Sequence, residues 1–360
     1  DQIRGLERVY ELRGSMNIAA VNMSLGGGVN YSACDTDTRK PIIDQLRAAG
    51  IATVIAAGNN GSTSYIGAPA CISSAIAVAS STIADQRSSF SNWNSLIGLV
   101  APGSDITSSV VGTNSSYESY NGTSMAAPHV TGALALLIER FPYMDNAQIR
   151  DVLLTTATDL GAPGVDPIYG WGLINLERAI EGPGQIRVDT DFIVDRMAGG
   201  TKVWAGLAWD DWTNDIGGPG RLTKSGVGWL RLSGDNTFGG ATVREGILEL
   251  DGSNALSADV VIAGGHLFLN GSLLGTDLRI DSGSALVRGS VSGGQTLVGV
   301  DGLLAGTGTL GNTRVDGTIA PGLSIGTLTI DGDYIQGVGS NFHDHLDLCV
   351  LCECTGDHSY

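Results

Sequence analysis

A short run in the first half of the chain, Asn121–Val130, combines a nucleophilic hydroxyl with residues that could expose it. Ser124 opens a predicted helix, Ser124–Arg140, which is apolar nearly all round and is therefore expected to be buried. A hydroxyl there lies where the helix N-terminus favours developing negative charge, and Gly122 lets a substrate backbone approach closely. The same residues also fit an ordinary serine N-cap. The residues of this run therefore leave two alternative roles for Ser124, a catalytic nucleophile and a structural cap.

The elements that would position Ser124 can be predicted from the first half of the chain. A strand, a helix and a second strand follow one another, and both strands are continuously apolar. Such strands are typical of a parallel sheet that is covered on both faces. The expected elements are a helix over 1–13, a strand over 18–23, a helix from Pro41 to Gly50, a strand over 51–57, and short strands over 76–79 and 99–101.

The second half is predicted to be all β. Gly246, Gly265, Gly283 and Gly302 each precede a short apolar or alternating segment, at spacings of 19, 18 and 19 residues. A period near twenty with strands and no helices predicts a β-solenoid, in which each rung buries its face against its neighbours. A meander of ordinary hairpins is the alternative.

The composition supports two architectures in one chain and excludes several classes of protein. Of the 53 glycines, 18 lie in residues 1–180 and 35 in residues 181–360. This much glycine argues against a coiled coil, and a hydrophobic content of 42% argues against disorder. The formal net charge is −17 and only three residues are lysine, so we expect no nucleic-acid partner.

Four segments of the first half resemble motifs of the subtilisin-like serine proteases, the subtilases. Gly122–His129 resembles the nucleophile motif, and Ser24–Gly27 resembles the strand end that pairs with substrate backbone. Ala56–Asn59 resembles the segment that lines the specificity pocket and supplies the oxyanion asparagine. Tyr169–Gly172, with Asn175, resembles the stretch that closes the catalytic domain. The resemblance covers residues 1–181 and implies the C-terminal part of a subtilisin-like α/β domain with a parallel sheet.

The resemblance implies a site for acyl transfer to a serine. Ser124 is implied as the nucleophile, with the side-chain amide of Asn59 and the backbone N–H of Ser124 as donors to the oxyanion. An ordinary turn at Asn59 is the alternative. The implied partner is a protein or peptide substrate, with no cofactor and no metal. The implied substrate-binding residues are Ser24, Leu25, Gly26, Gly27, Ala56, Ala57, Gly58, Gly122 and Thr123.

The chain departs from the subtilase pattern in the other two members of the catalytic triad. In the family, an aspartate and a His-Gly-Thr segment precede the strand that ends at Ser24, and neither segment is in this sequence. His129 lies five residues after Ser124, which on a helix is about 140° round the axis and about 7.5 Å along it, so we do not expect it to be the base. Asp281–Gly283 copies the aspartate motif only superficially. We expect the chain to be a fragment that is inactive as it stands.

Cys34 and Cys71 flank the segment that contains Asn59. Secreted bacterial subtilases often carry cysteines in the loops on either side of this segment, so the resemblance implies a disulfide between Cys34 and Cys71. A disulfide would stabilise the fold by about 2–4 kcal/mol and would indicate an oxidising compartment. Two buried free thiols are the alternative.

The second half resembles the passenger domains of autotransporters. Asn214–Lys224, followed by Leu232–Thr242, resembles the passenger-associated repeat, and Ala320–Leu328 resembles later rungs. Residues 182–230 contain glycine, proline and four tryptophans and indicate a loose connection. We therefore expect a linker over 182–213 and, with the resemblance, solenoid repeats over 214–340. The resemblance also implies a translocator barrel in the outer membrane, which this sequence does not contain, and a secreted or cell-surface location.

The last residues, 341–360, no longer resemble that family. Their Cys349, Cys352 and Cys354, with nearby histidines, could bind zinc, but we favour a foreign tail, for example from a frameshift. The sequence as a whole predicts a serine endopeptidase of the autotransporter type. A β-solenoid adhesin or stalk that carries a degenerate protease remnant is the main alternative, and a metal-binding module is a third.

Overall fold

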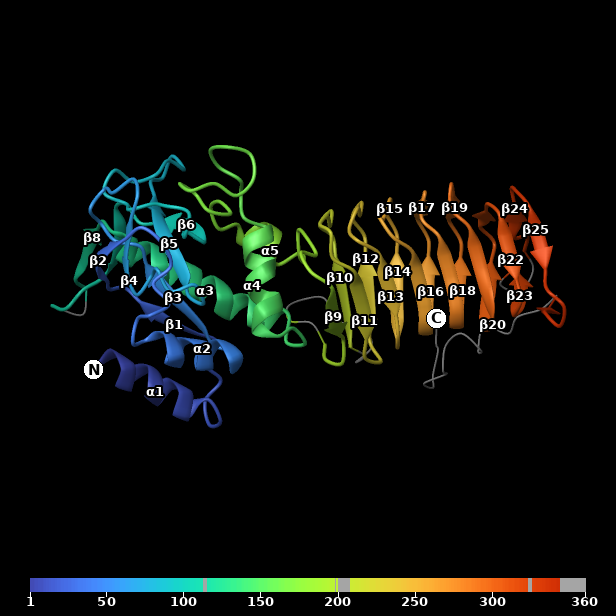
Figure 1. Ribbon diagram of the computed structural model, residues 1–360, viewed down its shortest axis with the longest axis horizontal. Helices are drawn as coiled ribbons and strands as arrows, with labels where there is room; N and C mark the ends of the chain where they lie inside the picture. Colours follow the sequence, from blue (N-terminus) through green and yellow to red (C-terminus); the bar gives the residue numbers. More distant parts are fainter. Residues whose placement is uncertain (113–114, 198, 200–207, 323–325, 344–360) are drawn as a thin grey trace. The chain divides into compact units, whose positions relative to one another are not determined.

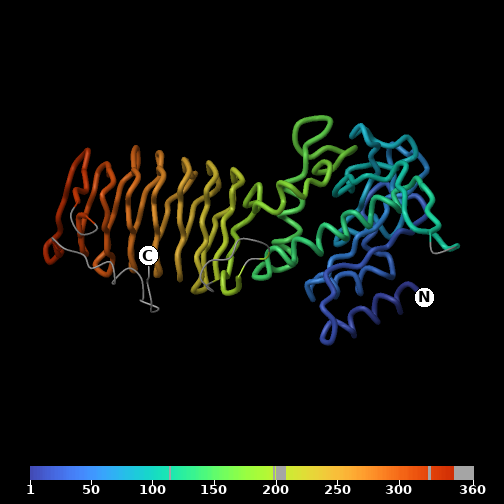
Figure 2. The backbone as a smooth tube through the Cα atoms, turned by 180° about the vertical axis from the view of Figure 1, so that it is seen from behind, coloured from blue at the N-terminus to red at the C-terminus, as the bar shows by residue number. Residues whose placement is uncertain are grey.

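In the computed structural model the chain forms two compact units, Asp1–Ile180 and Glu181–Tyr360. The structure describes residues 1–112, 115–197, 199, 208–322 and 326–343. The first unit combines helices with a sheet, and the second consists of strands alone in its described part (Figures 1 and 2). No described helix is both long enough and apolar enough to cross a lipid bilayer.

The first unit is built on a four-stranded parallel sheet, as the apolar strands predict. Its order is β1-β3-β5-β6, and each neighbouring pair runs parallel. Two antiparallel pairs, β2 with β4 and β7 with β8, lie outside this sheet. The strands are β1 (Ala20–Met23), β2 (Gly27–Asn30), β3 (Ala52–Ala56), β4 (Ile66–Ala68), β5 (Ile76–Ser81), β6 (Leu99–Pro102), β7 (Ile106–Ser109) and β8 (Tyr117–Tyr120).

Helices cover this sheet because both of its faces are apolar. Every residue of β3 and β5 is buried. The helix that carries the candidate nucleophile in its first turn, α3, contacts all four strands. One core cluster joins the other helices of the N-terminal part to β3 through Leu6, Ile43 and Ile55. The helices are α1 (Gln2–Leu12), α2 (Lys40–Ala48), α3 (Thr123–Arg140), α4 (Asn146–Thr155) and α5 (Leu176–Ala179).

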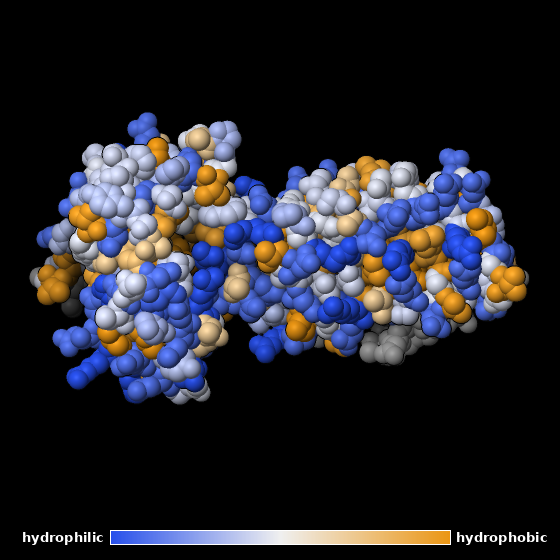
Figure 3. All heavy atoms as spheres, in the orientation of Figure 1, coloured by the Kyte–Doolittle hydropathy of each residue, from blue (hydrophilic) through white to orange (hydrophobic). Residues whose placement is uncertain are grey.

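The second unit is a long parallel β structure. Its strands form one sheet of thirteen strands and one of five, and every strand pairing in these two sheets is parallel. Hydrophilic residues are prominent on the face of this unit seen in Figure 3. Along the main row of strands Trp229 pairs with Ile247, then His266, Ser284 and Leu303, in steps of 18, 19, 18 and 19 residues.

These strands are short, apart from three of 10 or 11 residues whose mutual pairing contains register shifts. The set comprises β9 (Thr190–Ile193), β10 (Trp209–Trp212), β11 (Leu222–Ser225), β12 (Trp229–Leu232), β13 (Ala241–Val243), β14 (Ile247–Leu250), β15 (Ser253–Asn254), β16 (Val260–Leu269), β17 (Ser272–Leu274), β18 (Leu278–Val287), β19 (Ser290–Ser292), β20 (Thr296–Gly306), β21 (Thr309–Leu310), β22 (Thr313–Val315), β23 (Thr318–Pro321), β24 (Thr329–Ile330), β25 (Tyr334–Gln336) and β26 (Asn341–Phe342).

The segment 182–213 differs from the linker that the sequence predicts. It contains β9 and β10, which pair in parallel with β11 and β12. Phe192 and Trp212 are both buried, and their rings meet edge to face with centroids 4.9 Å apart. Glycine and proline suggested a loose connection, but aromatic burial stabilises ordered strands here. The cysteines at 349, 352 and 354 lie outside the described residues.

Lys224 is a fully buried cation in the second unit. In the parallel ladder it lies between Phe192 and Val243, both apolar. Its ammonium group donates hydrogen bonds to the carbonyls of Ser225 (3.1 Å), Gly226 (2.7 Å) and Glu245 (3.0 Å). These bonds satisfy the three donors of the group, while burial lowers the pKa of Lys224 to about 8.

The stability of the second unit should therefore depend on pH through Lys224. The pKa of Lys224 in the unfolded chain is near the ordinary 10.5, so between pH 8 and pH 10.5 the unfolded state binds more protons at this residue. The free energy of unfolding should rise across that window by about 3 kcal/mol relative to the Lys224→Met variant. Urea unfolding, followed by hydrogen exchange in peptides of β11 and β13, measures this. A difference between the two proteins that does not change with pH would contradict it.

Candidate active site

The structure brings the hydroxyl of Ser124 next to the end of β1. Ser124 lies in the first turn of α3 and is half-buried. Its Oγ donates a hydrogen bond of 3.4 Å to the carbonyl of Ser24, and the Oγ of Ser24 donates one of 2.7 Å to the carbonyl of Ser124. Because α3 packs against β1, the end of β1 and the start of α3 meet, although Ser24 and Ser124 are 100 residues apart in sequence.

Asn59 follows β3 and is held by the residue that precedes Ser124. Its Oδ1 accepts hydrogen bonds from the backbone N–H and the hydroxyl of Thr123, both at 2.9 Å. The hydroxyl of Thr123 also accepts one from the N–H of Gly58, at 3.1 Å. With its oxygen occupied in this way, the amide nitrogen of Asn59 lies beside Gly122, where an added Cβ would be 3.2 Å from it. The backbone nitrogen of Ser124 is 3.6 Å from the same Cβ position, so these two possible donors lie close together.

A residue that the sequence analysis missed, Asn92, holds the loop after β3. Asn92 is completely buried. Its Oδ1 accepts hydrogen bonds from the N–H groups of Asn60 (2.9 Å) and Ser62 (3.0 Å), and its own N–H donates to the carbonyl of Gly58 (2.9 Å). A Cβ on Gly58 would lie 2.5 Å from the amide nitrogen of Asn92, so this packing needs glycine at 58. No local pattern reveals Asn92, because it lies 32 residues from the loop that it binds.

The segments implied to hold substrate differ in accessibility. Ser24, Leu25, Gly26 and Gly27 are all exposed, as a surface that pairs with a substrate backbone must be. Ala56 and Ala57 are buried instead. The backbone of Ala57 is also used within the fold, since its N–H donates to Val78 and its carbonyl accepts from Gly67. The side chains of the two alanines therefore form the support of the site rather than its surface.

None of the described histidines is hydrogen-bonded to the hydroxyl of Ser124. The Nδ1 of His129 lies 2.8 Å from the carbonyl of Met125, one turn back on the same helix, and its side chain is exposed. His266 belongs to the second unit, where its Nδ1 lies 2.7 Å from the hydroxyl of Ser284. The carboxylate of Asp281 accepts from Arg279 at 3.1 Å. The geometry agrees with the expectation that His129 does not act as the base.

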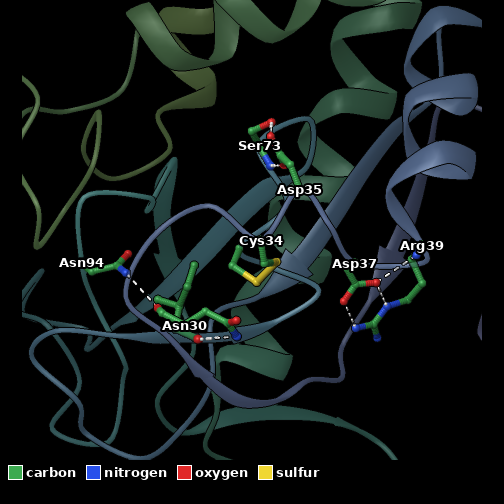
Figure 4. Close-up of a disulfide and its surroundings, with 9 residues drawn as sticks. Asn30, Cys34, Asp35, Asp37, Arg39, Ser73 and Asn94 are labelled. Carbon is green, nitrogen blue, oxygen red and sulfur yellow. Dashed lines mark hydrogen bonds and ion pairs between the residues drawn. A yellow bond between two sulfur atoms is a disulfide. The ribbon is translucent and has the colours of Figure 1, made fainter.

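Cys34 and Cys71 form a disulfide, with their Cα atoms 5.3 Å apart, so the alternative of two free thiols is wrong (Figure 4). The N–H of Cys34 also donates to the carbonyl of Cys71, at 3.0 Å. Next to the bridge, the carboxylate of Asp35 accepts from the N–H (3.0 Å) and the hydroxyl (2.7 Å) of Ser73, and these bonds lower the pKa of Asp35. The disulfide and this clasp join the chain after β2 to the chain after β4.

Asn30 ties β2 to its surroundings on the same side (Figure 4). Its amide nitrogen donates to the carbonyl of Ile66 in β4, and its carbonyl accepts from the amide of Asn94, both at 3.4 Å. Asp37 and Arg39 form an ion pair of 2.6 Å nearby, and hydrogen bonds from Arg39 lower the pKa of Asp37. These contacts give the exposed strand a fixed backbone.

Among the described residues no cluster of three or more histidine, cysteine, aspartate or glutamate side chains could hold a metal ion.

What the site presents is a serine hydroxyl, amide donors beside it and an exposed strand edge. The model of the subtilase family, Peptidase S8, matches residues 1–172. This part of the chain is similar to the subtilases.

Individual subtilases and related proteins match the chain over different lengths. An extracellular serine protease of Serratia marcescens is 35% identical over 68% of this chain and 24% of its own length. Subtilisin of Bacillus pumilus is 44% identical over 46% of this chain and 58% of its own length. Serotype-specific antigen 1 of Mannheimia haemolytica is 46% identical over 36% of this chain and 13% of its own length. The chain therefore spans less than two thirds of each of these relatives.

The match to the Serratia protease reaches beyond the subtilase unit. The first unit ends at Ile180 and holds half of the 360 residues, whereas the match covers 68% of the chain. Part of the parallel β unit is therefore similar to the same relative.

Proposed function

We propose that the intact protein is a serine endopeptidase that cleaves peptide bonds through an acyl-enzyme on Ser124. The observation that carries this proposal is that the hydroxyl of Ser124 donates to Ser24, while the amide nitrogen of Asn59 and the backbone nitrogen of Ser124 lie close together beside Gly122. A serine that served only as an N-cap would not need Asn59, which lies 65 residues away in sequence. The side-chain oxygen of Asn59 is occupied, and its amide donors adjoin the serine.

The first half-reaction uses the groups in these places. The oxygen of Ser124 attacks the carbonyl carbon of the scissile bond while a base takes the proton of the hydroxyl. The carbonyl oxygen becomes an oxyanion, which accepts hydrogen bonds from the amide of Asn59 and the backbone N–H of Ser124. The C–N bond then breaks, the amine leaves with the proton, and water later releases the acyl group. Backbone groups of Ser24–Gly27 hold the substrate during these steps.

The base of this reaction is proposed to lie upstream of Asp1, together with its aspartate partner. His129, the histidine of the first unit, is engaged with its own helix. We therefore propose that this chain alone is inactive, because a serine hydroxyl without a base is a weak nucleophile.

A fluorophosphonate probe tests this division of the active site. We expect negligible labelling of this chain and rapid labelling of Ser124 in the protein extended by its natural upstream segment. The Ser124→Ala variant of the extended protein is the control for labelling at other serines. Strong labelling of the present chain at Ser124 would contradict the missing base, and no labelling of the extended protein would contradict the proposed function.

Asn59 should contribute to the rate rather than to substrate binding. In the extended protein, Asn59→Ala is expected to lower kcat about 10²–10³-fold with little change in KM, since the donor acts on charge that develops in the transition state; this magnitude is the one known for subtilisin, a relative. Asn60→Ala, at the next exposed position of the loop, is the matched control. Steady-state hydrolysis of a peptide substrate measures both. A rise in KM with unchanged kcat would contradict this role of Asn59.

We also propose that the second unit is the β-solenoid passenger of an autotransporter. Its regular steps of 18 and 19 residues support a solenoid, because each strand then lies on the equivalent strand of the preceding turn. The proposed boundaries are 1–181 for the catalytic part and 214–340 for the repeats, with β9 and β10 of 182–213 pairing onto the first of these repeats. A secreted or cell-surface location agrees with the disulfide and with the extracellular protease that is similar to this chain. Export would require an outer-membrane barrel as partner.

The alternative is a solenoid adhesin or stalk that retains a degenerate protease part. The long parallel β unit is the observation that favours it. The upstream sequence distinguishes the two proposals, because an adhesin has no need for an aspartate segment and a His-Gly-Thr segment before residue 1. If both segments are encoded and the extended protein cleaves peptides, the adhesin alternative is excluded.

A further inference from the structure

A cavity in the first unit lies at the end of the sheet opposite to Ser124. Ser24 and Asn59 follow the carboxyl ends of β1 and β3, whereas this cavity is lined by the loops that precede those two strands. The end of α3 and the start of α4 complete its wall. Its volume is about 690 Å³, within the range of small-molecule sites, about 300–1,000 Å³. Ile138, which lines it, lies about 21 Å along α3 from Ser124.

The wall of this cavity has an apolar part and a polar part. Met16, Ile18, Ile138 and Met144 supply the apolar part. On the polar part Asp145 is already used, since its carboxylate accepts from the N–H of Gln148 at 2.8 Å as the N-cap of α4. A ligand that fits this wall needs an apolar body and a polar group at one end.

Asn146 shows which kind of polar group the cavity lacks. It is the first residue of α4, it lines the cavity, and only 9% of it is exposed. Its Nδ2 is buried and has no hydrogen-bond partner among the residues that the structure describes. Buried amide donors in folded proteins are nearly always bonded, so this group calls for an acceptor.

Arg13 adds a positive charge to the same wall. Its guanidinium lies over the ring of Tyr10, 3.7 Å from the centroid, and one N–H donates to the carbonyl of Tyr10 at 2.5 Å. These two contacts hold the guanidinium in place and occupy one of its five donors. A fixed cation and an unbonded amide donor together favour an anionic acceptor, and a carboxylate fits both.

We propose that this cavity binds a small apolar carboxylate. Arg13 and the Nδ2 of Asn146 donate to the carboxylate, and the apolar body lies against Met16, Ile18 and Ile138. A fatty acid and the C-terminal residue of a peptide share this chemistry. The proposal does not rest on the peptidase activity, since the cavity and Ser124 are at opposite ends of α3.

Titration of the full chain with sodium octanoate and with acetyl-leucine tests the proposal and distinguishes the two sources. Binding is measured by calorimetry and by the side-chain amide resonances of Asn146, which should shift on saturation. Octanol, which has no carboxylate, should bind about ten-fold more weakly. Saturable binding of octanoate alone identifies a fatty acid as the ligand, and binding of acetyl-leucine alone identifies a peptide C-terminus; either result supports the site.

Variants separate this cavity from adventitious surface binding. Arg13→Gln and Asn146→Ala should each weaken the carboxylate about ten-fold, and Ala49→Phe, at an exposed lining position, should fill the cavity and abolish binding. Arg4→Gln, on the exposed surface of α1 and outside the lining, should have no effect. Three results would overturn the proposal: no saturable binding of either carboxylate, equal affinity for octanol, or affinity that survives all three lining variants.

Discussion

Replacing Ser124 with alanine in the protein that carries its upstream segment is expected to lower kcat for peptide hydrolysis about 10⁶-fold, the loss known for the nucleophile of subtilisin, a relative. The reason is that the other hydroxyl at the start of α3, that of Thr123, is buried and is already bonded to the Oδ1 of Asn59 and the N–H of Gly58. The hydroxyl of Ser24 is engaged as well, because it donates to the carbonyl of Ser124 and stabilises the turn.

The measurement is the steady-state rate of release from a chromogenic peptide. Ser257→Ala, at an exposed serine of the second unit, is the matched control and should leave kcat unchanged. Because Ser124 also donates a hydrogen bond to Ser24, the melting temperature of the variant must be shown to be close to that of the parent protein. Activity that remains within ten-fold of the parent would exclude Ser124 as the nucleophile.

Gly271→Ala is expected to destabilise the second unit by at least about 3 kcal/mol. A methyl group on Gly271 would overlap the carbonyl oxygens of Asp251 and Gly252, which belong to the preceding turn of the chain. The same relation recurs along a row of glycines, since a methyl on Gly252 would overlap the carbonyl of Gly234, and one on Gly289 the carbonyl of Gly271. Backbone oxygens fixed by parallel pairing cannot move aside as a flexible side chain can.

Gly217→Ala is the matched control in the same unit. A methyl there would meet only the hydroxyl oxygen of Thr237, at an ordinary contact distance of 3.6 Å, so its cost should stay below about 1 kcal/mol. Urea unfolding of both variants, followed by hydrogen exchange in peptides of β14 and β17, measures the difference. Equal stabilities of the two variants would mean that the turns are not packed as closely as the geometry requires.

Several elements of the fold could be predicted because their signals are local. The apolar run over 51–57 predicts a strand, and the structure has β3 at Ala52–Ala56. The helix expected from Ser124 to Arg140 begins one residue earlier, at Thr123. The rung period was visible because glycines recur where one turn of the chain lies on the carbonyls of another. The pairing of the cysteines came from family resemblance rather than from their spacing.

Other features could not be predicted because they depend on contacts between distant residues. The segment 182–213 has the glycine and proline of a linker, and only the burial of Phe192 and Trp212 makes strands of it. A lysine within a strand is expected to face water, yet Lys224 is buried because carbonyls of two turns converge on its ammonium group.

The sequence by itself determined the helix that begins next to Ser124, the apolar strands of the sheet and the period of the second unit. Each of these can be read along the chain without knowing which elements pack together, from hydrophobic periodicity or from the positions of glycine. Only the tertiary structure decided that Asn92 holds the loop of Asn59, that Lys224 is buried, and that Arg13 and Asn146 line one cavity. Those relations join residues of separate elements, and no local pattern encodes which loops will meet when the sheet and helices pack.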